Sequence, residues 1–192
     1  MIITLREIQS RIRMGALGVE PEPNWSEAGP CDIPVRLSAD FVVLREHANT
    51  QRLCDKLALT RPGAPGMTSF PAAQAARYVI PPNGRVAVRS LERLVMPCDL
   101  AALVALRSTY ARLGLVTSPT LVDPGFEGHL VLEICGGAFP IEVGAGDALF
   151  KLVFFNLRAR AEPYSGHFQF QDAVLIPECT SSARSPEPSG DS

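Results

Sequence analysis

Glu133 is the residue of this chain that most invites a chemical interpretation, because it is a carboxylate near the end of an apolar run. The run, residues 129–134 (HLVLEI), alternates with a period of two, which is typical of a half-buried strand and puts Glu133 on the face opposite Leu132. A carboxylate there either belongs to a solvated outer face or acts as an acid or base beside a pocket. Asp123 precedes a Pro-Gly turn, where aspartate is also common for turn geometry alone.

A second group with chemical potential is the segment 107–114 (RSTYARLG), which combines two arginines with two hydroxyl side chains from Ser and Thr. In a helix, Ser108 and Arg112 share a face, while Arg107 and Thr109 lie in its first turn. Such donors suit a phosphate group. The plain alternative is a solvated arginine face, and the pattern alone leaves both interpretations open.

Several well-defined catalytic motifs are absent from the sequence. Pro30-Cys31 and Pro97-Cys98 lack the second cysteine of the P-C-x-x-C zinc motif, and no histidine begins an H-x-E. There is also no G-x-x-x-x-G-K-[ST] phosphate loop and no G-x-G-x-x-G dinucleotide motif. Chemistry at this protein's site would therefore use carboxylates, hydroxyls, arginines and water.

The elements that must position these groups are mostly short strands. Apolar or alternating runs separated by Gly, Pro and Asn, without interleaved amphipathic helices, predict a sandwich, barrel or jelly roll. A capping box at residues 4–7 and the apolar stripe behind it predict a helix from about 4 to 13, ended near Gly15. The segment 100–115 has helical propensity, and pattern cannot decide where a strand gives way to a helix within it.

Charge, cysteine content and length exclude several classes of protein. With 20 acidic and 18 basic residues there is no basic field for nucleic acid. The five widely spaced cysteines argue against a disulfide framework or a structural zinc site and favour a reducing compartment. No signal peptide or membrane span is indicated. We expect a cytoplasmic protein with a single domain over 1–179, an irregular excursion over 48–73 and a disordered tail over 180–192.

Read together, five segments resemble the dCTP deaminase branch of the dUTPase/dCTP deaminase superfamily. The segment 5–21 (LREIQSRIRMGALGVEP) is similar to the family's opening helix and turn, and 33–38 (IPVRLS) is similar to its first strand motif. The stretch 80–115 resembles the approach to its arginine-serine motif. The segment 122–134 (VDPGFEGHLVLEI) resembles its second signature, and 162–171 (EPYSGHFQFQ) resembles its C-terminal tyrosine-glutamine segment.

The resemblance implies a fold, an assembly and a reaction. The fold is mainly β, a distorted jelly roll or β-barrel with a short N-terminal helix and a short active-site helix, assembled as a homotrimer with active sites between subunits. It makes 100–106 a strand and 107–114 a short helix. The implied activity is that of a hydrolase of nucleotide metabolism, which deaminates dCTP to dUTP and ammonia without zinc. Mg²⁺ would be bound through the triphosphate.

The resemblance also assigns roles to individual residues. Glu133 matches the catalytic glutamate that moves a proton from the attacking water to the leaving amine. Ser108 and Arg112 match groups that position the water and stabilise charge. The implied contacts to the nucleotide are Arg107, Thr109, Tyr164 and Gln171 with the triphosphate, Asp123 with the 3′-hydroxyl and Phe126 with the sugar.

Departures from the family pattern keep alternatives open. Leu106 replaces a glycine, Pro34 replaces an aspartate, and the segment 167–171 (HFQFQ) lacks a cation and a glycine. The loop between Gly114 and Asp123 has the shorter spacing of dUTPases, in which a similar hairpin reads uracil through main-chain groups. One alternative is a dUTPase or related nucleotide pyrophosphohydrolase, with Asp123 orienting the water. A non-catalytic trimeric nucleotide-binding protein is another. An enzyme that also cleaves dUTP, or that acts on a modified cytosine nucleotide, is a third.

Overall fold

The computed structural model describes residues 1–44 and 72–174. The expected excursion over 48–73 falls almost wholly outside these ranges, and the expected tail over 180–192 does so completely. The first described element is helix α1 (Leu5–Arg13), in which the Thr4 hydroxyl accepts a hydrogen bond from the Glu7 amide at 3.4 Å. Gly15 follows the helix with a φ of 69°, a conformation that favours glycine. The predicted helix over 4–13 is therefore confirmed.

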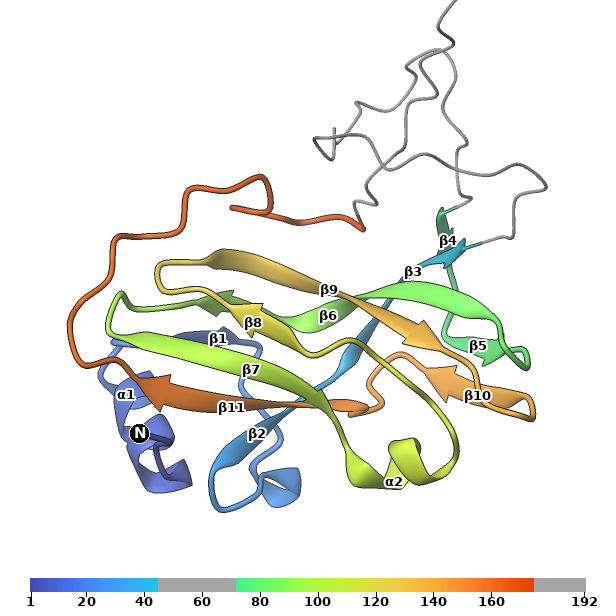
Figure 1. Ribbon diagram of the computed structural model, residues 1–192, viewed down its shortest axis with the longest axis horizontal. Helices are drawn as coiled ribbons and strands as arrows, with labels where there is room; N and C mark the ends of the chain where they lie inside the picture. Colours follow the sequence, from blue (N-terminus) through green and yellow to red (C-terminus); the bar gives the residue numbers. More distant parts are fainter. Residues whose placement is uncertain (45–71, 175–192) are drawn as a thin grey trace, which may run out of the picture. The chain divides into compact units, whose positions relative to one another are not determined.

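The largest sheet is built around the long strand β6 (Arg85–Val95). One edge of β6 pairs with β9 (Glu127–Cys135), and the other edge pairs with β3 (Leu37–Leu44) and β1 (Gly18–Glu20). Strand β4 (Ala72–Gln74) extends the sheet beyond β3 (Figure 1). All these pairings are antiparallel, although the paired strands lie far apart in the sequence.

A second sheet has the order β2-β11-β7-β8, and a two-stranded sheet joins β5 to β10 (Figure 1). The second sheet consists of β2 (Asp32–Val35), β11 (Phe150–Asn156), β7 (Leu100–Leu106) and β8 (Thr120–Val122). The small sheet consists of β5 (Arg77–Ile80) and β10 (Ile141–Gly144). Two short helices, η1 (Trp25–Glu27) and α2 (Ser108–Arg112), lie in the connections.

The hydrophobic core is formed by the inward faces of the two larger sheets. Leu132 and Ile134 of β9 are buried in the same apolar cluster as Phe150 and Phe154 of β11. Ile8 adds the inner side of α1 to this cluster. Since fully burying one large apolar side chain stabilises a fold by about 1.5–3 kcal/mol, this cluster fixes which face of β9 points inward.

Local pattern and tertiary pairing together explain the segment 100–115. Leu100–Leu106 pairs residue by residue with β11, so this part is a strand in spite of its helical propensity. The helix α2 then occupies only five residues and is followed by Gly114 with a φ of 91°. The strand and short helix implied by the resemblance are confirmed.

The predicted fold needs one correction. A mainly β chain with a short N-terminal helix and a short helix after β7 is confirmed, but the sheets do not close into a barrel. Within residues 1–44 and 72–174, no strand of the β6 sheet pairs with a strand of the β7 sheet. The outer strands β2 and β8 have no pairing on their far sides there. Face-to-face packing of apolar side chains, rather than a continuous hydrogen-bonded wall, joins the two sheets.

Candidate active site

Glu133 lies on the outer face of β9, as its alternation with Leu132 and Ile134 predicts. Its neighbours in the strand are buried, whereas Glu133 itself is exposed. On the β6 side its register partner is Ala87. Within the described part of the chain, no ion pair engages the Glu133 carboxylate. The single chain therefore presents Glu133 as an available carboxylate, but it does not shield it from water.

The edge of β9 that faces away from β6 is closed at both ends. At one end Cys135 exchanges two backbone hydrogen bonds with Val116, of 2.8 and 3.0 Å. At the other end the amide of His129 donates to the carbonyl of Gln171 at 2.8 Å. Backbone direction alternates along a strand, so the amide and carbonyl of Val131, midway between, face this same edge.

The middle of this edge is open within the described part of the chain. Across the described ranges, no hydrogen bond is made by the backbone of Val131 or by the amide of Glu133 on this side. The reason is topological: β8, which precedes β9 in the chain, pairs with β7 in the other sheet instead. Unpaired backbone groups are available for hydrogen bonds. The amide and carbonyl of Val131 and the amide of Glu133 can therefore bind a ligand beside the Glu133 carboxylate.

The arginine-serine segment lies at the Glu133 end of β9. Ser108, Thr109 and Arg112 are exposed side chains of α2. After Gly114, the chain reaches the Val116–Cys135 bridge within two residues. The structure therefore brings α2 toward the same end of β9 as Glu133.

Arg107 is positioned by contacts that sequence pattern does not indicate. Its amide donates to the carbonyl of Leu149 at 2.8 Å, which anchors the start of α2 beside β11. Its guanidinium donates to the carboxylate of Glu27 at 2.6 Å. Glu27 belongs to η1 and carries no motif that could have identified it. Arg107 is thus half-buried and held by an acidic partner.

The pKa of the Tyr110 phenol is affected by burial and by neighbouring charges, among them Arg107. Burial raises the pKa of the Tyr110 phenol above the usual value, the carboxylate of Asp147 raises it further, and the guanidinium of Arg107 opposes them. Tyr110 therefore lies in a partly desolvated environment together with the charged side chains of Asp147 and Arg107.

Asp123 and Phe126 lie at the opposite end of β9. The amide of Phe126 donates to the carbonyl of Asp123 at 3.2 Å, and Gly125 has a φ of 75°, so residues 123–126 form a tight turn. Asp123 is half-buried and Phe126 is buried. The ring centroid of Phe126 lies 6.1 Å from that of Tyr164, so the predicted sugar and phosphate contacts from these two segments meet here.

The C-terminal segment is fastened to this turn by Gln169, which the sequence analysis did not single out. The Gln169 amide group accepts from the backbone of Glu127 at 3.0 Å and donates to the carbonyl of Gly125 at 2.9 Å. The amide of Tyr164 donates to the carbonyl of Pro124 at 2.8 Å. These contacts hold Tyr164 beside the Asp123 turn. They join residues that are about 40 positions apart in the chain, so the sequence pattern does not indicate them.

Gln171 occupies a different environment from the exposed one that a phosphate contact requires. It is 6% exposed, and its side-chain nitrogen is buried without a hydrogen-bond partner in the described residues. Its backbone pairs with Gly128 and His129 of β9. In the single chain, the backbone of Gln171 therefore pairs with the edge of β9, while its side chain is buried.

The predicted site residues thus form two groups, one at each end of β9. Glu133, with α2 nearby, is at one end of β9, and the Asp123 turn with Tyr164 is at the other. At about 3.3 Å per residue, Glu127 and Glu133 are separated by roughly 20 Å along the strand. A ligand that reached both groups would lie along the outer edge of β9, where the backbone of Val131 is open.

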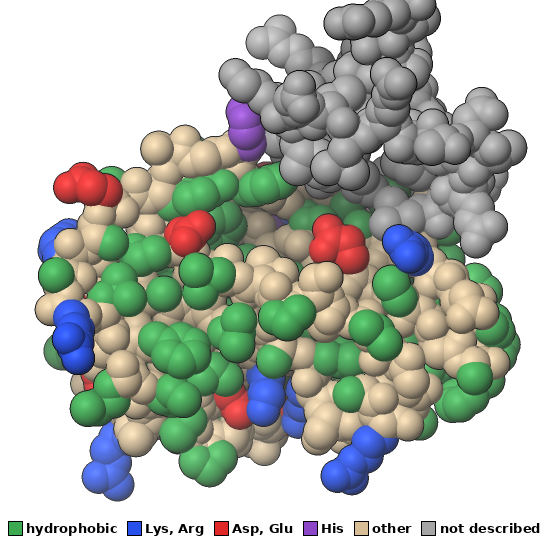
Figure 2. Space-filling view, viewed as in Figure 1, with side chains coloured by type: hydrophobic (Ala, Val, Ile, Leu, Met, Phe, Trp, Pro, Cys, Tyr) green, Lys and Arg blue, Asp and Glu red, His purple; other side chains and the backbone are tan. Residues whose placement is uncertain are grey.

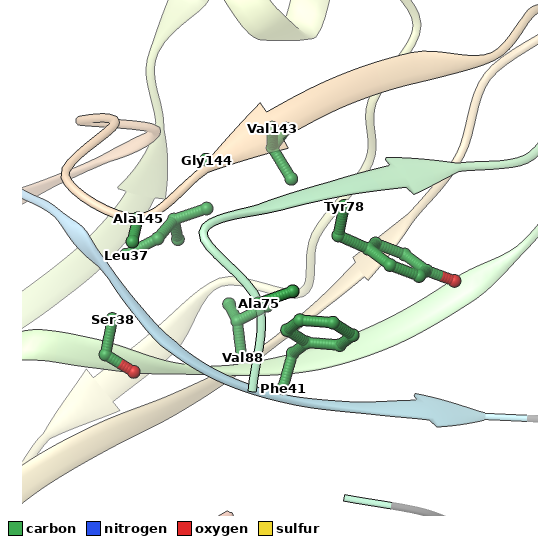
Figure 3. A pocket seen from close by; sticks show the side chains of 9 residues that line it. All are labelled: Leu37, Ser38, Phe41, Ala75, Tyr78, Val88, Val143, Gly144 and Ala145. Carbon is green, nitrogen blue, oxygen red and sulfur yellow. The ribbon is translucent and has the colours of Figure 1, made fainter. Parts of the chain in front are cut away.

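A small apolar pocket lies away from both groups (Figure 3). It is lined by side chains of β3, β5, β6 and β10, among them Phe41 and Tyr78, whose ring centroids are 4.6 Å apart. Ser38 and Tyr78 carry the hydroxyl groups among its lining side chains. None of the predicted site residues lines this pocket, so it does not compete with β9 as a candidate active site.

Neither a metal cluster nor a membrane span is found in the regions the structure covers. In residues 1–44 and 72–174, no three His, Cys, Asp or Glu side chains are grouped to hold a metal ion. No helix of these regions has the length and apolar character to cross a membrane. Cys31, Cys98 and Cys135 are free thiols.

Comparison with known proteins defines the class of the protein. The fold resembles the crystal structure of 2′-deoxycytidine 5′-triphosphate deaminase from Agrobacterium tumefaciens, with a TM-score of 0.63 and 21% sequence identity. The match covers 82% of this chain and 48% of that longer chain, so this chain spans about half its length. The protein therefore has a mainly β fold similar to that of this deaminase.

Sequence comparison identifies the family. The family model described as dCTP deaminase-like matches residues 2–157. A dCTP deaminase of Aeropyrum pernix is 32% identical over 179 residues, which cover 93% of this chain and 96% of that protein. A probable deoxyuridine 5′-triphosphate nucleotidohydrolase of Sulfolobus islandicus rod-shaped virus 1 is 37% identical over 100 residues, or 52% of this chain and 63% of that protein. The chain belongs to the dCTP deaminase-like family and is an enzyme of the dUTPase/dCTP deaminase superfamily.

Proposed function

We propose that this enzyme deaminates dCTP to dUTP and ammonia, with Glu133 as its general base and acid. The observation that carries the proposal is the exposed Glu133 carboxylate beside the unpaired backbone of Val131, on the outer edge of β9. Main-chain donors and acceptors can read the edge of a pyrimidine, and a carboxylate beside them can act on its exocyclic amine. The name of the Aeropyrum pernix relative supports the same substrate.

The reaction follows from proton transfer by one carboxylate. Glu133 removes a proton from a water molecule, and the water oxygen bonds to C4 of cytosine. The same proton is then delivered to the 4-amino group, the bond between C4 and the amino nitrogen breaks, and ammonia leaves. Transfer of the remaining hydroxyl proton to N3 gives uracil. Ser108 and Arg112 orient the water and stabilise the charge that develops on the ring. In this proposal Glu133, and no metal-bound hydroxide, activates the water, in keeping with the missing zinc motifs of the sequence.

The remaining residues bind the sugar and the triphosphate. Asp123 accepts a hydrogen bond from the 3′-hydroxyl, and Phe126 packs against the sugar. Arg107, Thr109, Tyr164 and Gln171 contact the triphosphate. For this, Arg107 must exchange Glu27 for phosphate oxygens, and Gln171 must turn its buried side-chain amide toward the ligand. Mg²⁺ would be held by the phosphate oxygens of the nucleotide.

A second copy of the chain completes the site in this proposal. The single chain leaves Glu133 exposed, whereas a general base works best where water is partly excluded. Apolar side chains such as Val116 and Leu121 are 60% and 58% exposed, and Figure 2 shows apolar side chains at many places on one face of the molecule. Burial of such side chains between copies supports the homotrimer with intersubunit sites. The free cysteines support a reducing compartment, for which we propose the cytoplasm.

The test is to incubate the purified protein with dCTP and Mg²⁺ and to follow ammonia and dUTP. Glu133→Gln should lower kcat by at least about a hundredfold, because general acid–base catalysis contributes roughly 10²–10⁴-fold. Glu142→Gln is a matched control, since Glu142 is an exposed glutamate of β10, and its kcat should equal that of the wild type. A Glu133→Gln enzyme that deaminates dCTP at the wild-type rate would refute the mechanism.

A dUTPase or related pyrophosphohydrolase is the second candidate, and the enzyme could also combine the two activities. The short loop from Gly114 to Asp123 and the viral relative favour this candidate. Asp123 would then orient water at the α-phosphate. Release of pyrophosphate from dUTP with dCTP left intact would favour it over the deaminase. Binding of these nucleotides and of a modified cytosine nucleotide without turnover would instead indicate a non-catalytic role.

A further inference from the structure

The loop between α2 and β8 is tied to the strand that carries Glu133 by one side chain. The hydroxyl oxygen of Thr117 lies 2.7 Å from the backbone carbonyl oxygen of Glu133. The same hydroxyl lies 3.5 Å from the carbonyl of Ser118. A hydroxyl has one proton to donate, and the much shorter distance places it on Glu133.

This hydrogen bond replaces a missing strand contact. Val116 pairs with Cys135 through two backbone hydrogen bonds, so the next outward-facing carbonyl along β9 is that of Glu133. A continuing antiparallel strand would supply the amide of Ser118 there. That amide makes no such bond among the described residues, and the hydroxyl of Thr117 takes its place.

Glu133 is thus held along both edges of its strand. On the inner side β9 pairs with β6, with Ala87 as the partner of Glu133. On the outer side the Thr117 hydroxyl fixes the Glu133 carbonyl at the point where the open edge of Val131 begins. The backbone of Glu133 sets the direction of its Cα–Cβ bond, and no described side chain forms an ion pair that would position the carboxylate in another way.

We infer that Thr117 is a positioning residue that sets the backbone, and hence the carboxylate, of Glu133 for proton transfer. The inference rests on the proposed role of Glu133 and extends it to the short loop. In this interpretation the short loop between Gly114 and Asp123 contributes to deamination by stabilising β9, the strand that carries the general base.

The experiment compares hydroxyl-free variants with a hydroxyl-bearing one. Thr117→Val keeps the side-chain volume but removes the donor, and Thr117→Ala removes the donor without adding a methyl group that could crowd the loop. Thr117→Ser keeps the donor. Loss of one hydrogen bond should lower kcat for dCTP about tenfold in Thr117→Val and Thr117→Ala, with KM within about twofold. Thr117→Ser should restore most of the wild-type kcat.

Binding is measured separately in the Glu133→Gln background, where turnover is blocked. Calorimetric affinity for dCTP with Mg²⁺ should be the same for Glu133→Gln and for the double variant with Thr117→Val. Equal weakening of binding and of kcat would show that Thr117 shapes the base-facing loop instead, and would overturn the inference. An unchanged kcat in both hydroxyl-free variants would also overturn it.

These results are distinguishable from a failure of the proposed function. If Glu133→Gln deaminates dCTP like the wild type, then the assignment of Glu133 is wrong whatever Thr117 does. If Glu133→Gln is inactive while Thr117→Val and Thr117→Ala retain full kcat, then only the positioning role of Thr117 is wrong.

Discussion

Arg107 donates a 2.6 Å hydrogen bond to the carboxylate of Glu27, and this contact joins the residue before α2 to a turn 80 positions earlier in the chain. The exposed fractions of the two side chains are 30% and 41%, so the pair is within reach of solvent and of an anionic ligand. A carboxylate that occupies a predicted phosphate contact competes with the phosphate. If Arg107 contacts the triphosphate as proposed, the Glu27–Arg107 pair sets how readily its guanidinium becomes available.

Removal of the Glu27 charge should strengthen nucleotide binding. Because exposed ion pairs contribute about 0.2–1 kcal/mol, we expect Glu27→Gln to lower KM for dCTP by up to about fivefold. The effect should shrink as salt is raised, since screening weakens the competing charge. Steady-state kinetics at low and high ionic strength measure it. A raised KM would show that Glu27 serves to hold Arg107 in place.

The attachment of the C-terminal segment to the Asp123 turn should contribute to substrate binding. Gln169→Leu removes both hydrogen bonds of the Gln169 amide group, to Gly125 and Glu127. We expect KM for dCTP to rise by up to about thirtyfold, since each of the two part-buried bonds contributes roughly 1 kcal/mol, while kcat changes less. Ser165→Ala, at an exposed neighbour in the same segment, is the control and should keep the wild-type KM. A change in kcat alone would contradict the expectation.

The buried Arg36–Glu92 pair should be essential for stability. Glu92 is 1% exposed and accepts from the Arg36 side chain at 2.6 Å and from its backbone at 2.8 Å. Arg36→Met leaves this carboxylate buried without its cation, which should cost about 3–5 kcal/mol of unfolding free energy. Arg77→Met, in an exposed pair with Glu142, should cost less than about 1 kcal/mol. Urea unfolding of both variants measures the two losses of unfolding free energy. Similar losses for Arg36→Met and Arg77→Met would contradict the expected importance of the buried pair.

Phe170 occupies a backbone conformation that suits a smaller residue. Its φ is 61° and its side chain is 66% exposed, so little packing offsets the strain of a bulky residue in the left-handed region. Asn tolerates this conformation, and Phe170→Asn should therefore raise the unfolding free energy by roughly 1 kcal/mol. Thermal unfolding tests the change. A lowered melting temperature would mean that the Phe170 ring makes a stabilising contact in the assembled protein.

The raised pKa of Tyr110 predicts a loss of stability at alkaline pH. The folded protein holds the phenol proton more firmly than the unfolded chain, which loses it near pH 10. The stabilisation is complete below pH 10 and is lost as the pH rises through the higher folded pKa. The unfolding free energy of Tyr110→Phe should accordingly fall less steeply above pH 10 than that of the wild type. Parallel slopes in denaturant titrations at pH 8–11 would contradict this.

The sequence alone determined the local features of the site. The alternation of residues 129–134 predicts that Glu133 points outward, and the core confirms it because Leu132 and Ile134 are buried. The capping box predicts α1, and the Pro-Gly pair predicts the turn after Asp123. Such features depend on residues close together in the chain, for which side-chain periodicity and backbone preference are sufficient.

Tertiary structure decided which of these features meet. The pairing of β8 with β7, instead of β9, leaves the edge at Val131 open, and no local pattern contains that choice. The partners Thr117 for Glu133, Gln169 for Gly125 and Glu27 for Arg107 are polar contacts across 16 to 80 positions. A hydrogen bond needs only one donor near one acceptor, so its sequence signature is weak. The packing of two sheets, which brings distant strand ends together, is what selects these partners.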